Sequence, residues 1–167
     1  MNSYVFSIGL TLAVIIAAVV LIWLGWRNRI RRQSQVPAPY ENFEDVEVHR
    51  FEGMYVCTTG GEDWLDRIAV HGLGVRGNAD LVIGERGVHF MRGGNDVHIP
   101  YSALTRLKRA SGMAGKFVEK DGLVVVGWAK DEAEFDTGFR ARYHTDIAKI
   151  YQLLASQIDD EAEQETN

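Results

Sequence analysis

The chain has 167 residues, enough for one ordinary domain and an anchor but too short for two well-packed independent cores. After Arg32 it carries 14 basic and 23 acidic residues, a net charge of −9, and nine of the acids lie in residues 41–47 and 159–165. The rest of that part is neutral, which argues against binding to nucleic acid. A lone cysteine, Cys57, excludes an intramolecular disulfide and is compatible with a reducing compartment.

The first element in chain order is an apolar segment, residues 5–26, that contains no charged residue. Thirteen of its 22 residues are Leu, Ile, Val or Phe, and a helix of this length, at about 1.5 Å per residue, spans the roughly 30 Å hydrocarbon core of a bilayer. No Lys or Arg precedes the segment, and arginines stand where a signal peptide would be cleaved. We therefore expect an uncleaved transmembrane helix, residues 4–26.

Four arginines follow this segment and set its predicted orientation: Arg27, Arg29, Arg31 and Arg32. By the positive-inside rule they place the N-terminus outside and the rest of the chain in the cytoplasm, as in a single-pass protein of the cell membrane. Gly9, Ala13 and Ala17 form a stripe of small residues at four-residue spacing, which would allow two such helices to pack as a homodimer. The expected partner of the segment is the lipid bilayer, with self-association as an open alternative.

The regions on either side of the globular domain differ in composition. Residues 27–48 are expected to be a basic juxtamembrane segment and an acidic linker, because Pro37 and Pro39 disfavour helix and favour an extended spacer. The acidic composition of residues 159–167 predicts a solvated, disordered tail. One domain, residues 49–158, remains between these flanks.

Within this domain, apolar residues alternate with polar ones or form short runs broken by glycine, a pattern typical of antiparallel strands. The expected strands are residues 51–59, 65–70, 79–84, 88–92, 97–99, 103–109, 116–120, 123–129 and 134–140. The dipeptide Asp121-Gly122 predicts a tight hairpin between the seventh and the eighth of them.

The pattern becomes helical near the C-terminus, where apolar residues recur at spacings of three and four over residues 147–158. Thr145 and Asp146 stand in the place for residues that cap the start of a helix. The expected fold class is therefore mainly β with one C-terminal helix.

Four motifs carry a resemblance to known proteins: Gly72-Leu-Gly-Val-Arg76, Ser111-Gly-Met-Ala-Gly-Lys116, Asp121-Gly-Leu-Val-Val125 and Asp136-Thr-Gly-Phe-Arg140. Over residues 4–158 the chain resembles a family of small actinobacterial single-pass membrane proteins with a cytoplasmic pleckstrin-homology-like (PH-like) domain. The resemblance implies a bent sheet or partial barrel capped by the C-terminal helix. It implies no catalytic or ligand-binding residue, and some relatives carry labels such as export or transporter protein.

Two glycine-containing segments partly match the sequence motifs of phosphate-binding loops. The glycines Gly72, Gly74 and Gly77 match the spacing of a dinucleotide-binding fingerprint, but a strand and not a helix is expected after them. Residues 111–116 lack the glycine spacing and the final Ser/Thr of a P-loop. Both segments are therefore interpreted as connections between strands.

The triplet Asp136-Thr137-Gly138 copies the motif of aspartic proteases, in which two such aspartates share a proton. An anchored dimeric protease remains a minor alternative, and we expect instead an aspartate near a turn that accepts backbone hydrogen bonds. The five histidines show no metal-ligand spacing and are expected to be structural or exposed. No metal or cofactor is expected.

One group of cations stands out within fifteen residues that contain a single acid: Arg106, Lys108, Arg109, Lys116 and Lys120. If the flanking strands pair, the group presents four net positive charges together. One interpretation is a solvated strand face. The other is a binding site for anionic lipid headgroups or for an acidic protein tail.

These features predict a non-enzymatic, membrane-anchored PH-like adaptor that positions a protein or an anionic lipid at the cytoplasmic face of the cell membrane. No paired catalytic groups, metal ligands or phosphate loop support an enzyme. The alternative is an accessory subunit of a membrane transport or export assembly, because a single helix without intramembrane charge cannot form a solute path alone.

Overall fold

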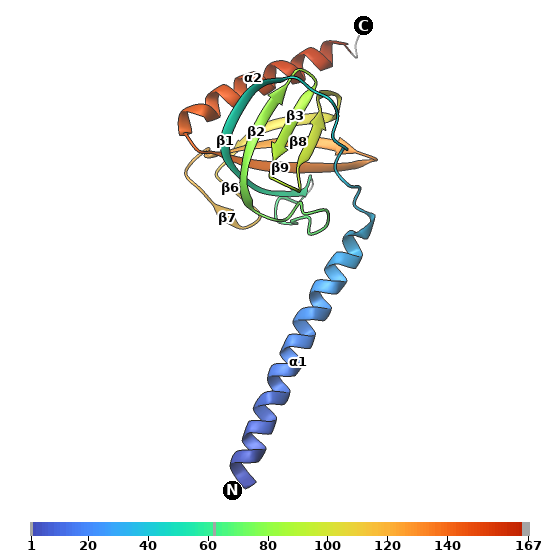
Figure 1. Ribbon diagram of the computed structural model, residues 1–167, viewed down its shortest axis with the longest axis vertical. Helices are drawn as coiled ribbons and strands as arrows, with labels where there is room; N and C mark the ends of the chain where they lie inside the picture. Colours follow the sequence, from blue (N-terminus) through green and yellow to red (C-terminus); the bar gives the residue numbers. More distant parts are fainter. Residues whose placement is uncertain (1, 62, 165–167) are drawn as a thin grey trace. The chain divides into compact units, whose positions relative to one another are not determined.

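Figure 1 shows the computed structural model, which describes residues 2–61 and 63–164. The chain forms two compact units, Met1–Gln35 and Val36–Asn167. The first unit is helical, and the second is a β domain that ends in a helix.

The first unit consists of one long helix and a short turn. Helix α1 (Asn2–Arg32) leads into a 3₁₀ turn, Gln33–Gln35. By length and composition, Phe6–Gln35 is able to cross a membrane. The helix does not stop at residue 26, because arginine is a good helix former and no Gly or Pro follows before Pro37. The four arginines therefore lie on the last turns of α1.

The second unit is built on a seven-stranded antiparallel sheet with the order β4-β3-β2-β1-β9-β8-β5. Its strands are β1 (Glu47–Gly60), β2 (Gly77–Gly84), β3 (Gly87–Met91), β4 (Val97–Pro100), β5 (Leu104–Ala110), β8 (Leu123–Lys130) and β9 (Ala133–Ala141). A small separate sheet pairs β6 (Gly112–Met113) with β7 (Lys116–Phe117). A 3₁₀ turn, Tyr101–Ala103, joins the edge strands β4 and β5, which do not pair with each other. The bent sheet is thus a partial barrel that is not closed.

The core lies inside the curved sheet, because alternate residues of each strand point to the same face. Its largest fully buried side chains include Trp128, Tyr55, Phe90, Phe139, Leu81 and Ile99. Helix α2 (His144–Gln164) adds Ile147, Ile150 and Leu154 to this core and covers one opening of the barrel in Figure 1. The expected fold class, mainly β with a capping C-terminal helix, is confirmed.

The ends of α2 differ from the sequence prediction. The helix begins at His144, so Thr145 and Asp146 lie in its first turn and not before it. There the negative Asp146 carboxylate stabilises the helix by interacting with the positive end of the helix dipole. At the other end, α2 continues to Gln164 because Ala, Glu and Gln are good helix formers. Residues 159–164 of the expected disordered tail are therefore helical, and residues 165–167 lie outside the described part of the chain.

Eight of the nine expected strands are present, and the strand at residues 65–70 is wrong. The Asp63 carboxylate accepts a hydrogen bond from the Leu65 amide at 2.8 Å, and the Asp66 amide donates to the Asp63 carbonyl at 3.0 Å. Such aspartate turns compete with strand pairing. Only one isolated bridge, between Thr59 and Arg67, remains there.

The predicted tight hairpin at Asp121-Gly122 is also wrong. Residues 119–122 do form a turn, in which Asp121 has a φ of 57° and the Gly122 amide donates to the Glu119 carbonyl. However, β8 pairs with β5, and β7 pairs with the unpredicted two-residue strand β6. The reason is burial: most of β8 is buried, whereas both residues of β7 are exposed.

The chain between the two units is not a free spacer over its second half. Residues 36–46, here called the strap, pack on the β domain. Tyr40 forms a bridge with His98 of β4, and its hydroxyl donates to the Ala129 carbonyl at 2.9 Å. Lys130 donates to two strap carbonyls, 2.7 and 3.2 Å away. The strap therefore links edge strand β4 to the end of β8.

Candidate functional site

The sequence-predicted basic group is divided by the sheet, and two of its members surround a buried acid. Arg106 and Lys108 point to the outer face of β5, two residues apart. Arg106 Nε lies 3.0 Å from Asp136 Oδ1, and Lys108 Nζ lies 2.7 Å from Asp136 Oδ2. The Asp136 side chain is 3% exposed. These two cations are therefore committed to a carboxylate of the same domain.

A glycine makes this ion-pair cluster possible. Arg106 on β5, Gly127 on β8 and Asp136 on β9 are aligned by the strand registers. A Cβ atom at Gly127 would lie 2.2 Å from Arg106 Cγ, so only glycine lets the arginine cross β8. Arg106 also donates to Glu134 at 2.7 Å, and the hydrogen bonds to Glu134 and then Asp136 raise the pKa of Arg106 despite its partial burial. The cluster ties three strands together.

The other three cations of the group lie elsewhere. Arg109 points to the opposite face of β5, with its guanidinium carbon 4.9 Å from the ring centre of Tyr151 on α2. Lys116 lies on β7 and Lys120 lies in the turn after it, both exposed. The structure therefore does not assemble the five cations into one surface. Whether Lys116 and Lys120 bind an anion remains a prediction.

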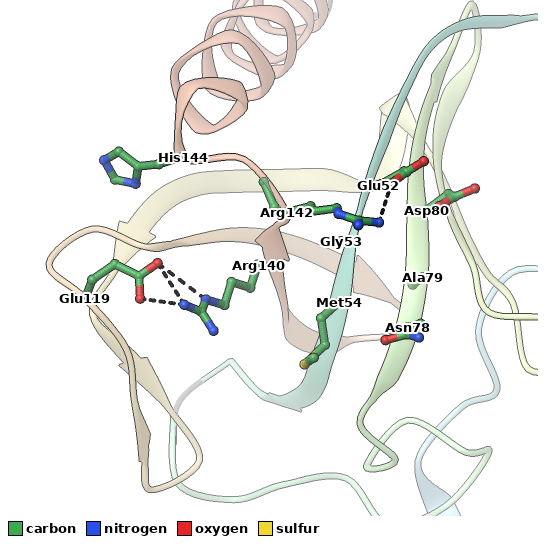
Figure 2. Close-up of a pocket in the computed structure, with 11 residues that line it drawn as sticks. Glu52, Gly53, Met54, Asn78, Ala79, Asp80, Glu119, Arg140, Arg142 and His144 are labelled. Carbon is green, nitrogen blue, oxygen red and sulfur yellow. Dashed lines mark hydrogen bonds and ion pairs between the residues drawn. The ribbon is translucent and has the colours of Figure 1, made fainter.

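A groove of about 610 Å³ lies on the domain, and Figure 2 shows it. It lies where β1, β2 and β9 pass the start of α2. Its lining residues are Glu52, Gly53, Met54, Asn78, Ala79, Asp80, Glu119, Arg140, Ala141, Arg142 and His144. Residues of three neighbouring strands thus form its floor, and the loop before β8 contributes Glu119 to one wall.

Two ion pairs frame the groove. Arg140 reaches toward Glu119, with Nη2 and Oε2 2.9 Å apart, and Arg142 reaches toward Glu52 over the same distance (Figure 2). A hydrogen bond from the Glu119 backbone, together with those from Arg140, lowers the pKa of the Glu119 carboxyl. The wall is therefore zwitterionic, and both pairs are accessible to a ligand.

Sequence reasoning did not find the groove, because its residues come from distant segments, from Glu52 to His144. The alternation of β1 and β9 does place Glu52, Met54 and Arg140 on outward positions. Only the β1–β9 register, in which Met54 faces Arg140, brings them together.

Sequence reasoning also missed a second polar cluster, because no motif connects its three members, Asp45, His89 and His98. His89 and His98 are buried side by side on β3 and β4, with Nδ1 atoms 2.8 Å apart, and His89 Nε2 donates to Asp45 of the strap at 2.9 Å. Burial alone would raise the pKa of Asp45, but hydrogen bonds from His89 and from the amides of Arg86 and Val46 outweigh it and lower the pKa. Among the described residues, no group of three or more His, Cys, Asp or Glu could hold a metal ion.

The aspartic-protease-like triplet has a different structural role from the one expected. Asp136 lies within β9 and accepts hydrogen bonds from side chains, so its expected place near a turn is wrong. Thr137 points inward, where its hydroxyl accepts from Trp128 Nε1 at 2.9 Å and bonds Thr58 Oγ1 at 2.7 Å. Both residues are therefore engaged within the sheet.

The glycine-rich segment near residue 74 forms part of a connection between strands, as expected. Gly72 has a φ of 69° in a turn, and Gly77 begins β2. No helix follows in the described chain up to the end of β2. The helix N-terminus that would hold a pyrophosphate is therefore missing from this place.

A bent antiparallel sheet capped by a C-terminal helix defines a PH-like domain. The chain belongs to the Bacterial PH domain-like family, whose profile matches residues 33–155. Among curated proteins, none matches the chain. A solved structure titled "The 8S snRNP Assembly Intermediate" is similar with a TM-score of 0.48 and 6% identity, over 73% of this chain and 89% of that chain. The family match includes the whole strap.

Proposed function

We propose that the protein is a membrane-anchored PH-like binding module, not an enzyme, that positions a partner at the cytoplasmic face of the cell membrane. The observation that carries the proposal is the groove of about 610 Å³, a size typical of ligand sites. PH-like domains are typically non-catalytic binding folds. The buried carboxylate of Asp136, which a protease would need free, is held by two cations.

The chemistry of the groove favours a polypeptide segment that carries both charges. The Glu119–Arg140 and Glu52–Arg142 pairs are nearly half exposed or more, and exposed ion pairs contribute only about 0–1 kcal/mol. Breaking these two ion pairs to form new ones with a partner would therefore cost little free energy. Two other lining residues add to these contacts: Met54 offers an apolar side chain, and Asn78 offers an amide group. An anionic lipid headgroup on Lys116 and Lys120 is the second partner class.

Helix α1 supports the proposed position at the membrane. Its apolar segment supports anchoring, and Arg27, Arg29, Arg31 and Arg32 at its end support a cytoplasmic domain. Protease added to intact spheroplasts should then spare the domain. Digestion of the domain from outside would overturn this orientation.

Site-specific photocrosslinking in cells tests the groove. A photoreactive residue at Asn78, in the groove, should give one discrete protein adduct, whereas the same residue at the exposed Gln152 of α2 should not. Exchanging Glu119 and Arg140 keeps the ion pair but reverses its direction, and should abolish the adduct. Equal adducts at both positions, or an adduct indifferent to the exchange, would contradict the proposed groove.

Replacing residues 5–26 by an unrelated apolar helix distinguishes an adaptor from an accessory subunit of a transport assembly. An adaptor that binds through the groove should keep the Asn78 adduct. An accessory subunit of a transport assembly, which packs through its own helix, should lose it. Crosslinking to lipid in place of protein would assign the groove to headgroups.

A further inference from the structure

Two buried imidazoles meet nitrogen to nitrogen at the edge of the sheet. His89 of β3 and His98 of β4 are register partners, both less than one-tenth exposed, with Nδ1 atoms 2.8 Å apart. On the other side of His89, Nε2 donates to the Asp45 carboxylate, which is 5% exposed. Asp45 belongs to the strap, so these three groups join the strap to the sheet.

The contact between the two Nδ1 atoms restricts the number of protons that the pair can hold. A hydrogen bond between two nitrogens needs one hydrogen between them, and a neutral imidazole has one N–H and one lone pair. With His89 Nε2–H on Asp45, the contact forms when both rings are neutral or when either one carries a positive charge. When both rings are protonated, each Nδ1 carries a hydrogen and the contact must break. The second proton is therefore incompatible with this geometry.

We propose that Asp45, His89 and His98 form a proton-operated latch. The strap stays on the sheet while the imidazole pair carries at most one positive charge, and its part beside His98, from Tyr40 to Phe43, is released when both rings are protonated. The ligand of this site is a proton, and Asp45 stabilises the first positive charge at short range.

The latch holds the second half of the strap. The Asp45 carboxylate accepts the Arg86 amide at 3.0 Å and the Val46 amide at 2.8 Å. The Phe43 ring lies 4.9 Å from that of His89, centre to centre. A charged His98 that turns away from His89 would disturb the ring against which Phe43 packs. Asp45 keeps its hydrogen bond with a charged His89, so opening the latch would free the part of the strap beside His98. There Tyr40 forms its bridge, and the Phe43 ring lies 6.4 Å from the His98 ring, centre to centre.

Other charged groups lie around the pair. On β1 and β2, Arg50 is paired with Glu47 and with Asp80. Arg86, beside the strap, donates to the Glu44 carbonyl at 3.1 Å. The ordinary pKa values of these residue types lie outside the range from about 5 to 8.

Two further groups lie near the pair, and a third histidine contacts the far end of the strap. Asp96, in the turn before β4, favours the charged form of His98, but burial and then His89 outweigh it and lower the pKa of His98. Burial, followed by the charge of Asp45, raises the pKa of Tyr101 to about 12, so this residue stays neutral. His71 contacts the Val36 carbonyl at the far end of the strap, and it needs a control of its own.

Release of the strap would change the reach of the domain. The strap has eleven residues and follows directly on the turn that ends the first unit. Extended, the eight residues 36–43 span up to about 26–29 Å. Release of this part would therefore lengthen the free chain that precedes the domain.

Spin labelling of the full chain in lipid nanodiscs tests the latch. A nitroxide at Glu41→Cys reports on the strap, and the native Cys57 is buried and stays unlabelled. We expect restricted motion at about pH 7.5 and a predominantly mobile spectrum at about pH 5. His98→Asn keeps an amide donor near the place of Nδ1 but cannot take up a proton, so its label should stay restricted at both pH values.

Two control variants separate the latch from other histidines. His144→Gln, at the start of α2, and His71→Asn, which tolerates its φ of 56°, should both keep the pH-dependent mobility. A label whose mobility does not change with pH in the otherwise native chain overturns the latch. So does a transition that persists in His98→Asn.

Ring ¹⁵N NMR of the unaltered chain gives a second test that does not depend on a variant folding. Ring shifts of a doubly protonated His89 and His98 pair should appear only together with changed amide shifts for Tyr40 and Phe43 of the strap. A doubly protonated pair with unchanged amide shifts at these two residues would overturn the proposal.

Discussion

Two nearly buried carboxylates in this domain differ in the kind of partner that holds them. Asp136, 3% exposed, is held by Arg106 and Lys108. Asp45, 5% exposed, is held by His89 and two backbone amides. Arginine and lysine are charged throughout the physiological pH range, whereas histidine is the side chain that changes its charge within it. The ion pairs of Asp136 should therefore persist throughout this pH range, whereas we expect the contacts of the Asp45 cluster to depend on pH.

The two clusters also differ in what they join. The Asp136 cluster connects β5 to β9 across β8, strands that are already hydrogen-bonded in one sheet. The Asp45 cluster attaches the strap, which makes few other backbone contacts with the sheet. Loss of the first should thus reduce the stability of the whole domain, and loss of the second should mainly free one segment.

The largest expected effect comes from removing both cations around Asp136. The double variant Arg106→Met and Lys108→Met leaves a buried carboxylate without a counter-charge. We expect the free energy of unfolding to fall by about 3 kcal/mol, the lower end for a buried pair because both cations are partly exposed. Urea unfolding of the full chain in detergent, followed by the fluorescence of the buried Trp128, measures this change.

The control for this prediction removes two cations of the same sequence group. Lys116 and Lys120 are exposed and make no ion pair among the described residues. Changing both to Met should alter the free energy of unfolding by no more than about 0.5 kcal/mol. Similar losses in the two double variants would show that Asp136 is not clamped.

The next largest effect concerns the other carboxylate. Asp45→Ala removes the acceptor of His89 and of the amides of Arg86 and Val46. We expect a loss of about 1–3 kcal/mol, because donors are left without a partner. The loss should be accompanied by faster hydrogen exchange at Arg86. Unchanged exchange there would contradict the attachment of the strap by Asp45.

Sequence reasoning was most successful where the signal is local. The apolar run that became α1 and the three-and-four spacing around Ile150 each lie in one continuous segment. The alternation of strands likewise located β1, β2 and β9. These patterns depend only on neighbours in the chain, and a single sequence contains them in full.

The clusters could not be predicted, because they depend on register. Arg106 and Asp136 are thirty residues apart and meet only because Gly127 stands between them. The strap has prolines and acids like a free spacer, and the missed signal was its two aromatic residues, Tyr40 and Phe43, which pack on the domain. Composition over the whole segment concealed these two anchors.

The two clusters are also expected to differ in how the stability of the domain depends on pH, because only one of them lies next to a histidine pair. Because burial and then His89 lower the folded pKa of His98, the unfolded chain binds this proton more tightly. Stability is therefore complete above about pH 6.5 and falls as the pH drops toward the folded pKa, by at most about 1.4 kcal/mol per pH unit. His98→Asn should flatten this part of the curve, and the double variant at Arg106 and Lys108 should keep it. An equal slope in His98→Asn would assign the dependence to another group.

The smallest expected effect tests the attachment of the strap far from the histidines. Tyr40→Phe keeps the ring near Trp128, at 6.2 Å between centres, and beneath the Lys130 ammonium at 4.8 Å. It removes only the hydroxyl that donates to Ala129, so the free energy of unfolding should fall by about 1 kcal/mol. Tyr143→Phe, at an exposed tyrosine, is the matched control and should be neutral.

This variant also distinguishes two ways in which the strap can be held. If the hydroxyl and the latch hold it independently, the losses in Tyr40→Phe and Asp45→Ala should add to within about 0.5 kcal/mol. If the strap detaches as one unit, removing either end already frees the other, and the double variant should lose little more than Asp45→Ala alone. The proton-operated latch requires the second result, because only then does a charge change at His98 release the segment as far as Tyr40.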